Sequence, residues 1–296
     1  MTVTADLATA WRRDGWCVVP DAVPRDVLEG AQAALAPLFP APEVMDKDLG
    51  EHTAPFRTWD AAWPEFPYAD PALNRLSVHD VCLDLAETLL GTPDVLLYQG
   101  FVSAKYAGQI SGFNQLLHVD YPNHMLLVPR REVGFQQLTM FVYLNDVTEE
   151  NGATRMLSQQ RTAAIPVERH TLAYAKYPEF YDEDRPAEGK AGSIVAYRPD
   201  VFHRSVDHMR PGQVRYMMHL AFRPVGSDWA GYQSWPFKGF SMEWFSFVQH
   251  ATPRQLAVFG FPKPGHPYWT AETLAGVAAR YPGLDMTAWR TAAGVD

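Results

Sequence analysis

The stretch Leu116-Leu117-His118-Val119-Asp120-Tyr121 places an imidazole and a carboxylate two residues apart inside an apolar run. Successive side chains of a strand point to opposite faces, so His118 and Asp120 are expected to share one face. Neutral imidazole and carboxylate suit an ion such as Fe(II), and two histidines with one carboxylate leave positions open for oxygen and a cosubstrate. Because the chain has 10 histidines, such a pair also arises by chance. The stretch therefore indicates a metal site only if a third ligand lies further along.

The composition excludes several classes of protein. A chain of 296 residues, 47% of them hydrophobic, is long enough to bury a core. The net charge of −9, without a basic stripe among the aromatic residues, disfavours a nucleic-acid partner. The sequence has neither a long apolar run nor a secretion signal. Cys17 and Cys82 lie in apolar stretches, which disfavours a disulfide framework or a thiolate metal site. We expect a cytoplasmic protein with no membrane partner; its oligomeric state stays open.

The expected elements change character near Gly91. Residues 1–91 read as mostly helical, and residues 92–223 read as strands in succession, separated by Gly, Pro and Asn turns. Strands without intervening helices favour an antiparallel sandwich or barrel, so the fold is expected to be mainly β with flanking helices, in one domain spanning 1–296. The expected helices lie at 4–13, within 24–40 and at 72–90. The expected strands lie at 16–19, 95–105, 115–121, 133–145, 152–157, 193–197 and 214–223.

Three further segments interrupt or follow these elements. Residues 40–70 read as a long ordered loop, because they are rich in Pro and aromatic residues without a clear period. Residues 161–190 read as a polar insertion among the strands. Residues 224–296 form an aromatic-rich C-terminal part, which is either a cap buried on the sheet or the lining of an apolar pocket or dimer face.

His203 is the candidate for the third metal ligand. It follows residues 192–198, whose composition predicts a buried strand, and the turn at Pro199-Asp200. The next strand carries Arg215 among apolar residues, and a buried cation is costly unless it is paired. A guanidinium matches a carboxylate with two hydrogen bonds, so a dicarboxylic cosubstrate could chelate the metal at one end and bind Arg215 at the other. The alternative is an arginine paired with an Asp or Glu of the protein.

These motifs, taken together, resemble those of the phytanoyl-CoA dioxygenase family of Fe(II)/2-oxoglutarate oxygenases. The resemblance rests on His118-x-Asp120, the turn Asp-Val-Thr-Glu-Glu-Asn-Gly at 146–152, Gly192-Ser193-Ile194, His203 and Arg215, and it covers about Gly15 to Arg223. One departure is that Ser158-Gln159-Gln160-Arg161 replaces the familiar Pro-Gly-Ser-His turn. The histidine missing there is not a metal ligand, so the departure concerns only the loop.

The resemblance implies a cupin-like double-stranded β-helix, or jelly roll, and a set of roles. His118, Asp120 and His203 would be the catalytic iron ligands, and Arg215 would pair with the C5 carboxylate of 2-oxoglutarate. Ser205 and Lys105 match family positions near that cosubstrate.

Four further residues are candidates for substrate contact. They are Gln99, which matches a substrate-contact position of some members of the family, Tyr121 and His124 at the expected pocket mouth, and His219, four residues after Arg215 on one strand face. His219 also has a simpler interpretation as a hydrogen-bonded core histidine.

The function implied is hydroxylation of an unactivated C–H bond of a small, largely apolar metabolite. O2 and 2-oxoglutarate would be consumed and succinate and CO2 formed, with ascorbate as a reductant that keeps the iron reduced. Asp120 favours hydroxylation, desaturation or ring formation over halogenation, because related halogenases lack this carboxylate. Two alternatives stay open: a cupin-like dioxygenase or isomerase that uses the metal without 2-oxoglutarate, and a non-catalytic jelly roll that binds a small molecule.

Overall fold

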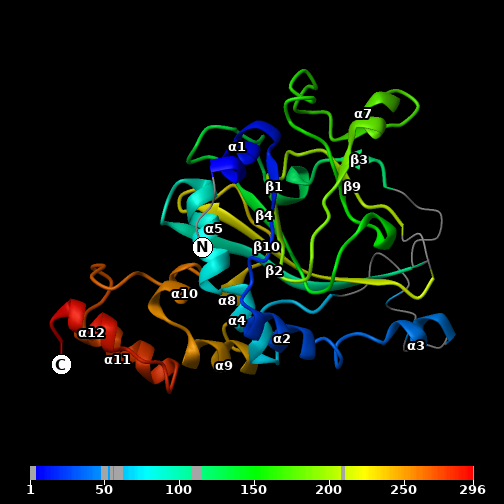
Figure 1. Cartoon of the computed structure of the whole chain (residues 1–296). Helices are drawn as coiled ribbons and strands as arrows, with labels where there is room; N and C mark the ends of the chain where they lie inside the picture. Colours follow the sequence, from blue (N-terminus) through cyan, green and yellow to red (C-terminus); the bar gives the residue numbers. More distant parts are fainter. Residues whose placement is uncertain are drawn as a thin grey trace.

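The strands form two antiparallel sheets of five strands each (Figure 1). The computed structural model describes residues 5–47, 53, 56, 63–107, 115–207 and 211–295. The major sheet has the order β1 (Trp16–Val19), β8 (Ile194–Tyr197), β4 (Leu138–Tyr143), β10 (Val214–Pro224) and β2 (Val95–Tyr106). The minor sheet has the order β6 (Thr171–Leu172), β3 (Leu117–His118), β9 (His203–Arg204), β5 (Arg155–Met156) and β7 (Arg185–Pro186). The prediction of antiparallel sheets with flanking helices is therefore confirmed.

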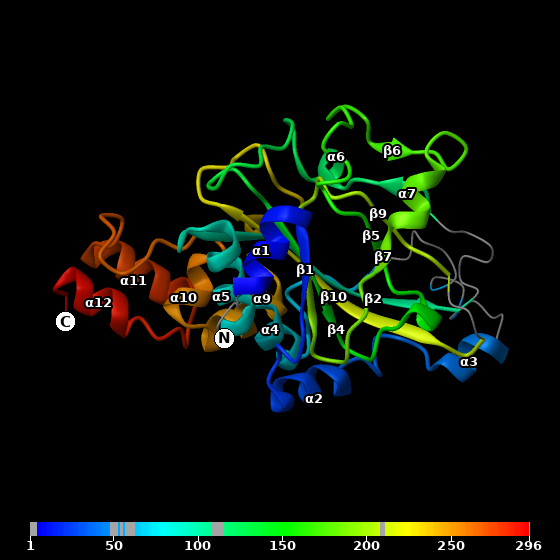
Figure 2. The same cartoon turned by 45° about the horizontal axis from the view of Figure 1, so that its top comes forward.

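Helices flank the sheets, and the C-terminal ones lie at the opposite end of the molecule from the minor sheet (Figures 1 and 2). None of the described helices is long and apolar enough to cross a membrane. The α-helices are α1 (Ala5–Asp14), α2 (Arg25–Ala33), α3 (Pro42–Lys47), α4 (Pro71–Ser77), α5 (Asp80–Leu90), α6 (Tyr121–His124), α7 (Pro178–Glu183), α8 (Trp235–Lys238), α9 (Met242–His250), α10 (Pro253–Ala257), α11 (Ala271–Arg280) and α12 (Thr287–Ala293), and η2 (Glu149–Asn151) is a 3-10 turn.

The two faces of the major sheet pack against different partners. In β4, Met140 and Val142 join the core formed with the helices, whereas Phe141 and Tyr143 join a second core on the other face. This division follows the alternation of side chains along a strand. On the helical side, α5 packs against β2, β4 and β10. The face that carries Phe141 and Tyr143 is therefore the inner face, which looks toward the minor sheet.

Local capping explains why the predicted helix at 72–90 is two helices. The Asp70 side chain accepts a hydrogen bond from the backbone N–H of Ala72 at the start of α4, and His79 caps α5 in the same way. Gly91 ends α5 in the left-handed conformation, with φ of +70°, as a helix-terminating glycine does. The apolar stripe that spans both helices is real, but the cap at His79 divides it.

The minor sheet differs most from expectation. Only Leu117 and His118 of the predicted strand 115–121 are in β3, because the chain turns at Asp120 and α6 begins at Tyr121. Leu117, Val119 and Tyr121 of this stretch nevertheless pack in one core cluster, whereas Leu116 is exposed. The insertion 161–190 does not simply interrupt the strands, since it contributes β6 and β7. Part of the predicted loop 40–70 lies outside the described residues, and its last part contains the cis Phe66-Pro67 bond.

The C-terminal aromatic segment divides between core and surface. Trp235, Trp244 and Phe247 are buried in the main core, where Trp235 and Phe247 make edge contacts with Phe66. Phe237 and Phe240 are instead largely exposed. The interpretation as a buried cap therefore holds for the first group and not for the second.

A buried carboxylate holds two like-charged strands of the minor sheet together. Arg155 of β5 and Arg204 of β9 are directly opposite each other in the register, an arrangement that destabilises a sheet unless the charges are compensated. The fully buried Asp184 accepts hydrogen bonds from both, with its Oδ2 2.6 Å from Nε of Arg204. Asp184 therefore fixes β9, the strand that carries His203.

We expect Asp184→Asn to lower the free energy of unfolding by about 3 kcal/mol, because it removes the buried carboxylate between two partly buried guanidinium groups, of which Arg155 retains only Glu149 and Arg204 loses its ion pair. Urea denaturation followed by circular dichroism measures this. Asp94→Asn is the matched control, since it removes only the exposed ion pair with Lys263. An equal loss of unfolding free energy in the two variants would contradict the role given to Asp184.

Candidate active site

Backbone carbonyls orient the two histidines at the centre of the site. His118 of β3 and His203 of β9 are register partners across the minor sheet. Nδ1 of His118 lies 2.8 Å from the carbonyl oxygen of Leu116, and Nδ1 of His203 lies 3.0 Å from that of Val201. In a neutral imidazole this leaves the proton on Nδ1 and a lone pair on Nε2. Both lone pairs are thus available in the space between the rings.

Asp120 completes a cluster of three acceptor groups. Its Oδ1 lies 3.7 Å from Nε2 of His118, and its Oδ2 lies 3.3 Å from Nε2 of His203. Burial opposes ionisation of Asp120, but the nearby histidines, His203 first, and the Tyr197 hydroxyl hold its pKa below the usual value. Burial, and then His203, lowers the pKa of His118, which favours the neutral ring. In the described part of the chain, no other group of three His, Cys, Asp or Glu could hold a metal ion.

This cluster fits a metal ion. A carboxylate and two imidazole lone pairs that face one another without a proton between them repel, and a cation removes the repulsion. One carboxylate with two imidazoles is also the donor set typical of non-haem Fe(II) sites with open positions. The second hydrogen bond of each imidazole, made to a carbonyl, is what metal-binding histidines usually have.

A second polar centre lies around Arg215 on the inner face of β10. The Arg215 guanidinium is buried, and its Nη1 donates to the carbonyl of Gly152 and lies 3.4 Å from Oγ1 of Thr154. Its Nε has no hydrogen-bond partner among the residues that the structure describes. Burial lowers the pKa of Arg215 to about 10, so it stays charged at neutral pH. Within the described ranges no Asp or Glu pairs with Arg215. The alternative interpretation, an arginine paired inside the protein, therefore finds no support.

Lys105 adds a second cation at this end. It is the register partner of Arg215 on β2, and its Nζ donates to Oγ of Ser205 at 2.7 Å and to the carbonyl of Val206. Burial, and then Arg215, lowers the pKa of Lys105 to about 7, with Asp207 acting in the opposite direction. Two buried cations side by side favour an anion between or beside them.

The turn at 146–152 shapes this end of the site. A capping box links Thr148 and Asn151, and Gly152 follows in the left-handed conformation, with φ of +75°. A Cβ at Gly152 would lie 2.7 Å from the carbonyl oxygen of Val206, so no larger residue fits there. The turn therefore places the carbonyl that receives the Arg215 hydrogen bond.

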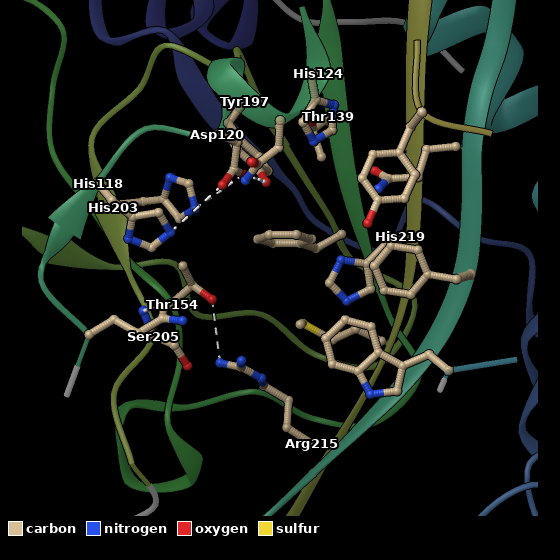
Figure 3. A pocket seen from close by; sticks show the side chains of 18 residues that line it. His118, Asp120, His124, Thr139, Thr154, Tyr197, His203, Ser205, Arg215 and His219 are labelled. Carbon is tan, nitrogen blue, oxygen red and sulfur yellow. Dashed lines mark hydrogen bonds and ion pairs between the residues drawn. The ribbon is translucent and has the colours of Figure 1, made fainter. Parts of the chain in front are cut away.

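Both centres line one cavity of 160 Å³ (Figure 3). Figure 3 shows His118, Asp120 and His203 on one side, Arg215 below Thr154 and Ser205, and His219 across from the triad. Gln99 and His124 also line the cavity, and Nδ1 of His124 lies 3.0 Å from the Tyr98 hydroxyl. Lys105 does not line it but supports Ser205.

Tyr121 is a wrong prediction as a residue of this cavity. Its hydroxyl donates to the carbonyl of Val167 and lies 2.8 Å from Nε2 of His170, on the opposite side of the stretch from the triad. The reason is that the chain turns into α6 after Asp120, which packs Tyr121 into the core behind the minor sheet.

The sequence interpretation missed Tyr197. Its hydroxyl donates to Oδ2 of Asp120 at 2.8 Å, and its ring packs edge-on against His203. Burial, and then the adjacent Asp120, raises the pKa of Tyr197 well above its usual value, so the phenol stays a donor. Tyr197 lies on the same face of β8 as Val195, two residues earlier in the inner core. Alternation along the predicted strand 193–197 was the available signal.

The departure at Ser158–Arg161 has a structural replacement. Oγ of Ser158 donates to Oδ1 of Asp14 at 2.6 Å, and the backbone N–H of Gln159 donates to the carbonyl of Asp14 at 2.9 Å. The Gln159 side chain accepts from Arg198, near the end of β8. This loop is therefore tied to the end of α1 by polar contacts rather than by the familiar motif.

The family model described as phytanoyl-CoA dioxygenase (PhyH) matches residues 11–213. The chain belongs to the phytanoyl-CoA dioxygenase family. This is a family of Fe(II)/2-oxoglutarate-dependent oxygenases, so the predicted cofactors and the general class of enzyme are confirmed at the level of the family. A comparison with curated proteins finds no match.

Several solved structures share the fold at low sequence identity. HygX from Streptomyces hygroscopicus, with nickel and 2-oxoglutarate bound, is 14% identical over 76% of this chain and 88% of its own, with a TM-score of 0.54. EctD from S. alaskensis, with bound Fe, is 21% identical over 76% of this chain and 78% of its own, with a TM-score of 0.53. The non-haem monooxygenase ThoJ, as a nickel complex, is 19% identical over 74% and 77%, with a TM-score of 0.51.

For this member of the phytanoyl-CoA dioxygenase family, we expect Tyr197→Phe to weaken metal binding about 10- to 100-fold, because hydrogen bonds behind a ligand fix its orientation. Titration of the metal-free protein with Co(II), without oxygen, gives the affinity and the visible spectrum. Tyr143→Phe is the control, since this buried phenol lies on the same sheet face but donates to the carbonyl of Ala187. Tyr197 has no such role if both variants bind Co(II) like the unaltered protein.

Proposed function

We propose that the protein is an Fe(II)/2-oxoglutarate-dependent dioxygenase that hydroxylates an unactivated C–H bond of a small, largely apolar metabolite, with formation of succinate and CO2. The observation that carries this proposal is the common cavity. On one side the side chains of His118, Asp120 and His203 converge, and on the other lies a buried guanidinium without a carboxylate partner among the described residues. A metal ion with a chelating dicarboxylate satisfies both.

Each residue has a role that follows from its contacts. His118, Asp120 and His203 would hold the iron, with Tyr197 keeping Oδ2 of Asp120 in place. Arg215 would bind the remote carboxylate of 2-oxoglutarate with two hydrogen bonds, because its Nε lacks a partner. Bound iron and 2-oxoglutarate supply the oxidising power needed to break an unactivated C–H bond.

The polar side chains near the proposed 2-oxoglutarate carboxylate also provide hydrogen-bond donors to it. Lys105 donates to Ser205, so the Ser205 hydroxyl is free to donate its own proton to a carboxylate in the cavity. Gln99, His124 and His219 line the cavity without net charge and would orient the substrate. The surrounding Phe101, Phe141 and Met217 side chains exclude water from the space between them.

The architecture and setting belong to the same proposal. The two facing sheets support a double-stranded β-helix, and we treat 1–296 as one oxygenase domain, with 92–223 as its core. The major sheet also includes β1 from the N-terminal part, which ties that part to the core. HygX with nickel and 2-oxoglutarate and EctD with Fe support the cofactor assignment by analogy of fold. The proposal also includes a cytoplasmic location, the use of O2 and a small-molecule substrate, and no nucleic-acid or membrane partner.

We expect the purified protein to bind 2-oxoglutarate only when it is loaded with Fe(II), and to form succinate slowly in air. Arg215→Gln should weaken 2-oxoglutarate binding about 10- to 100-fold, since it removes charge-assisted hydrogen bonds. Calorimetry without oxygen and chromatographic detection of succinate measure the two effects.

Arg223→Gln is the matched control, because Arg223 lies on the same strand but pairs with Asp228 outside the cavity. Binding of metal without 2-oxoglutarate would favour the cupin-like alternative that needs no such cosubstrate. Absence of metal binding would favour the non-catalytic alternative.

The affinity for 2-oxoglutarate should fall as the pH rises above about 7. The pKa of Lys105 is about 7 in the cofactor-free protein, and a bound carboxylate favours the protonated amine, which raises that pKa in the complex. Binding above pH 7 must therefore take up a proton, whereas binding below pH 7 does not. Dissociation constants from pH 6 to 9 measure this. Lys105→Met should flatten the profile, and an unchanged slope in that variant would exclude Lys105 as the titrating group.

A further inference from the structure

Charge is divided along the inner face of the major sheet. Alternation places Arg215, Met217, His219 and Ala221 of β10 on this face, opposite Lys105, Ser103, Phe101 and Gln99 of β2. The end with Arg215 and Lys105 is cationic, and the other end is uncharged. Asp120 and Arg215 are the only charged side chains among the described residues that line the cavity.

Three nearly parallel rings form the wall at the uncharged end. The ring centroids of Phe101 and His219 are 4.2 Å apart at an interplanar angle of 13°. Trp63 lies 5.0 Å from Phe101 at 10° and 6.0 Å from His219 at 11°. All three line the cavity, and His219 lies across it from the metal ligands (Figure 3). The three rings therefore form one stack, which gives this end of the cavity an apolar aromatic wall.

His219 belongs to this wall as a neutral ring. Its Nε2 lies 2.9 Å from Oγ of Ser103, and Phe141 contacts it edge-on at 4.9 Å. Burial, and then Arg215, lowers the pKa of His219 to about 3, so it carries no charge at neutral pH. The prediction of His219 as a cavity residue and its alternative as a hydrogen-bonded core histidine thus both describe part of its environment.

Gln99 supplies polarity at this end. The side chain is only 5% exposed and lines the cavity, and within the described chain its amide has no protein partner. Because the Gln99 side chain lines the cavity, a ligand group that both donates and accepts, such as a hydroxyl, could hydrogen-bond its amide. Gln99 is thus suited to recognise an uncharged polar substituent.

We propose that the part of the substrate that reaches the metal is an uncharged, flat, aromatic or conjugated ring, which packs along Trp63, Phe101 and His219 and hydrogen-bonds Gln99 through a hydroxyl or carbonyl group. This inference rests on the proposed function. An anionic group at this position finds no free cation, because 2-oxoglutarate occupies Arg215. A cationic group finds no free carboxylate, because the metal occupies Asp120. A saturated ring fills the space but loses the stacking.

Three probes of similar size test the inference: 2-naphthol, 2-naphthoate and trans-2-decalol. Equilibrium dialysis at pH 7.5 uses the full chain loaded with Co(II) and 2-oxoglutarate, without oxygen, so that binding is read without turnover. 2-Naphthol should bind about tenfold more tightly than the naphthoate, which is charged, and than the decalol, which is not flat. Equal or tighter binding of either rival, or no binding of 2-naphthol, overturns the inference.

Substitutions in the wall test whether its aromatic rings cause the preference for 2-naphthol. Phe101→Leu and Trp63→Leu should abolish the preference for 2-naphthol over the decalol, and Gln99→Leu should weaken the binding of both alcohols. Phe222→Leu is the matched control, since Phe222 is on β10 but packs in the helical core. The binding of Co(II) and 2-oxoglutarate is measured first in each protein. If these do not bind, the proposed function fails; if they bind without the preference, only the substrate inference fails.

Discussion

The site depends on the assignment of the imidazole protons. Nδ1 of His118 and Nδ1 of His203 each lie within hydrogen-bond distance of a backbone carbonyl oxygen two residues earlier in the chain, that of Leu116 and that of Val201. The lone pairs therefore have no direction left except toward Asp120. Without a cation this is a cluster of acceptors, which is unfavourable; with one it is a rigid ligand set. The backbone just before β3 and β9 thus orients the two imidazole rings.

The two sheets contribute different properties. The major sheet has strands of up to 12 residues, and its alternation places cations at one end of the inner face and neutral rings at the other. The minor sheet has strands of two residues and carries His118 and His203, two of the three proposed metal ligands. Such short strands have few ladder hydrogen bonds, so side chains fix them instead. Asp184 does so for Arg155 and Arg204, and Tyr197 reaches from the major sheet to Asp120.

The sequence was sufficient for the parts of the site that obey a local rule. His118 and Asp120 follow from their spacing, and Arg215 follows from the cost of burying a cation in a strand. Alternation also places Tyr121 with Leu117 and Val119, on the face away from the triad, so its predicted position at the pocket mouth did not follow from this rule. Whether a strand ends after two residues depends on hydrogen bonds from distant segments, such as those of Asp120 and Tyr121 to the carbonyl of Pro199. A periodic pattern contains no information about these.

The long strands could therefore be predicted from the sequence better than the short ones. β2 and β10 have enough residues for a period of two to be evident, whereas β6 and β7 do not. Tyr197 was within reach, since it shares a face with Val195, but its meaning requires knowing that Asp120 lies opposite. The proximity of Tyr197 to Asp120 arises from the tertiary structure and cannot be inferred from the pattern of either strand.

The proposed position of 2-oxoglutarate, between the two sheets, has a consequence for the whole molecule. The proposed metal ligands belong to the minor sheet and the turn after β3, and Arg215 belongs to the major sheet, so a dicarboxylate that reached both would join the two sheets. Its binding free energy adds to the packing between the sheets, because it binds only when they face each other correctly. Like groups meet at each end of the cavity, acceptor atoms at the triad and cations at Arg215 and Lys105, and like charges repel. A metal ion at one end and a dianion at the other would compensate both.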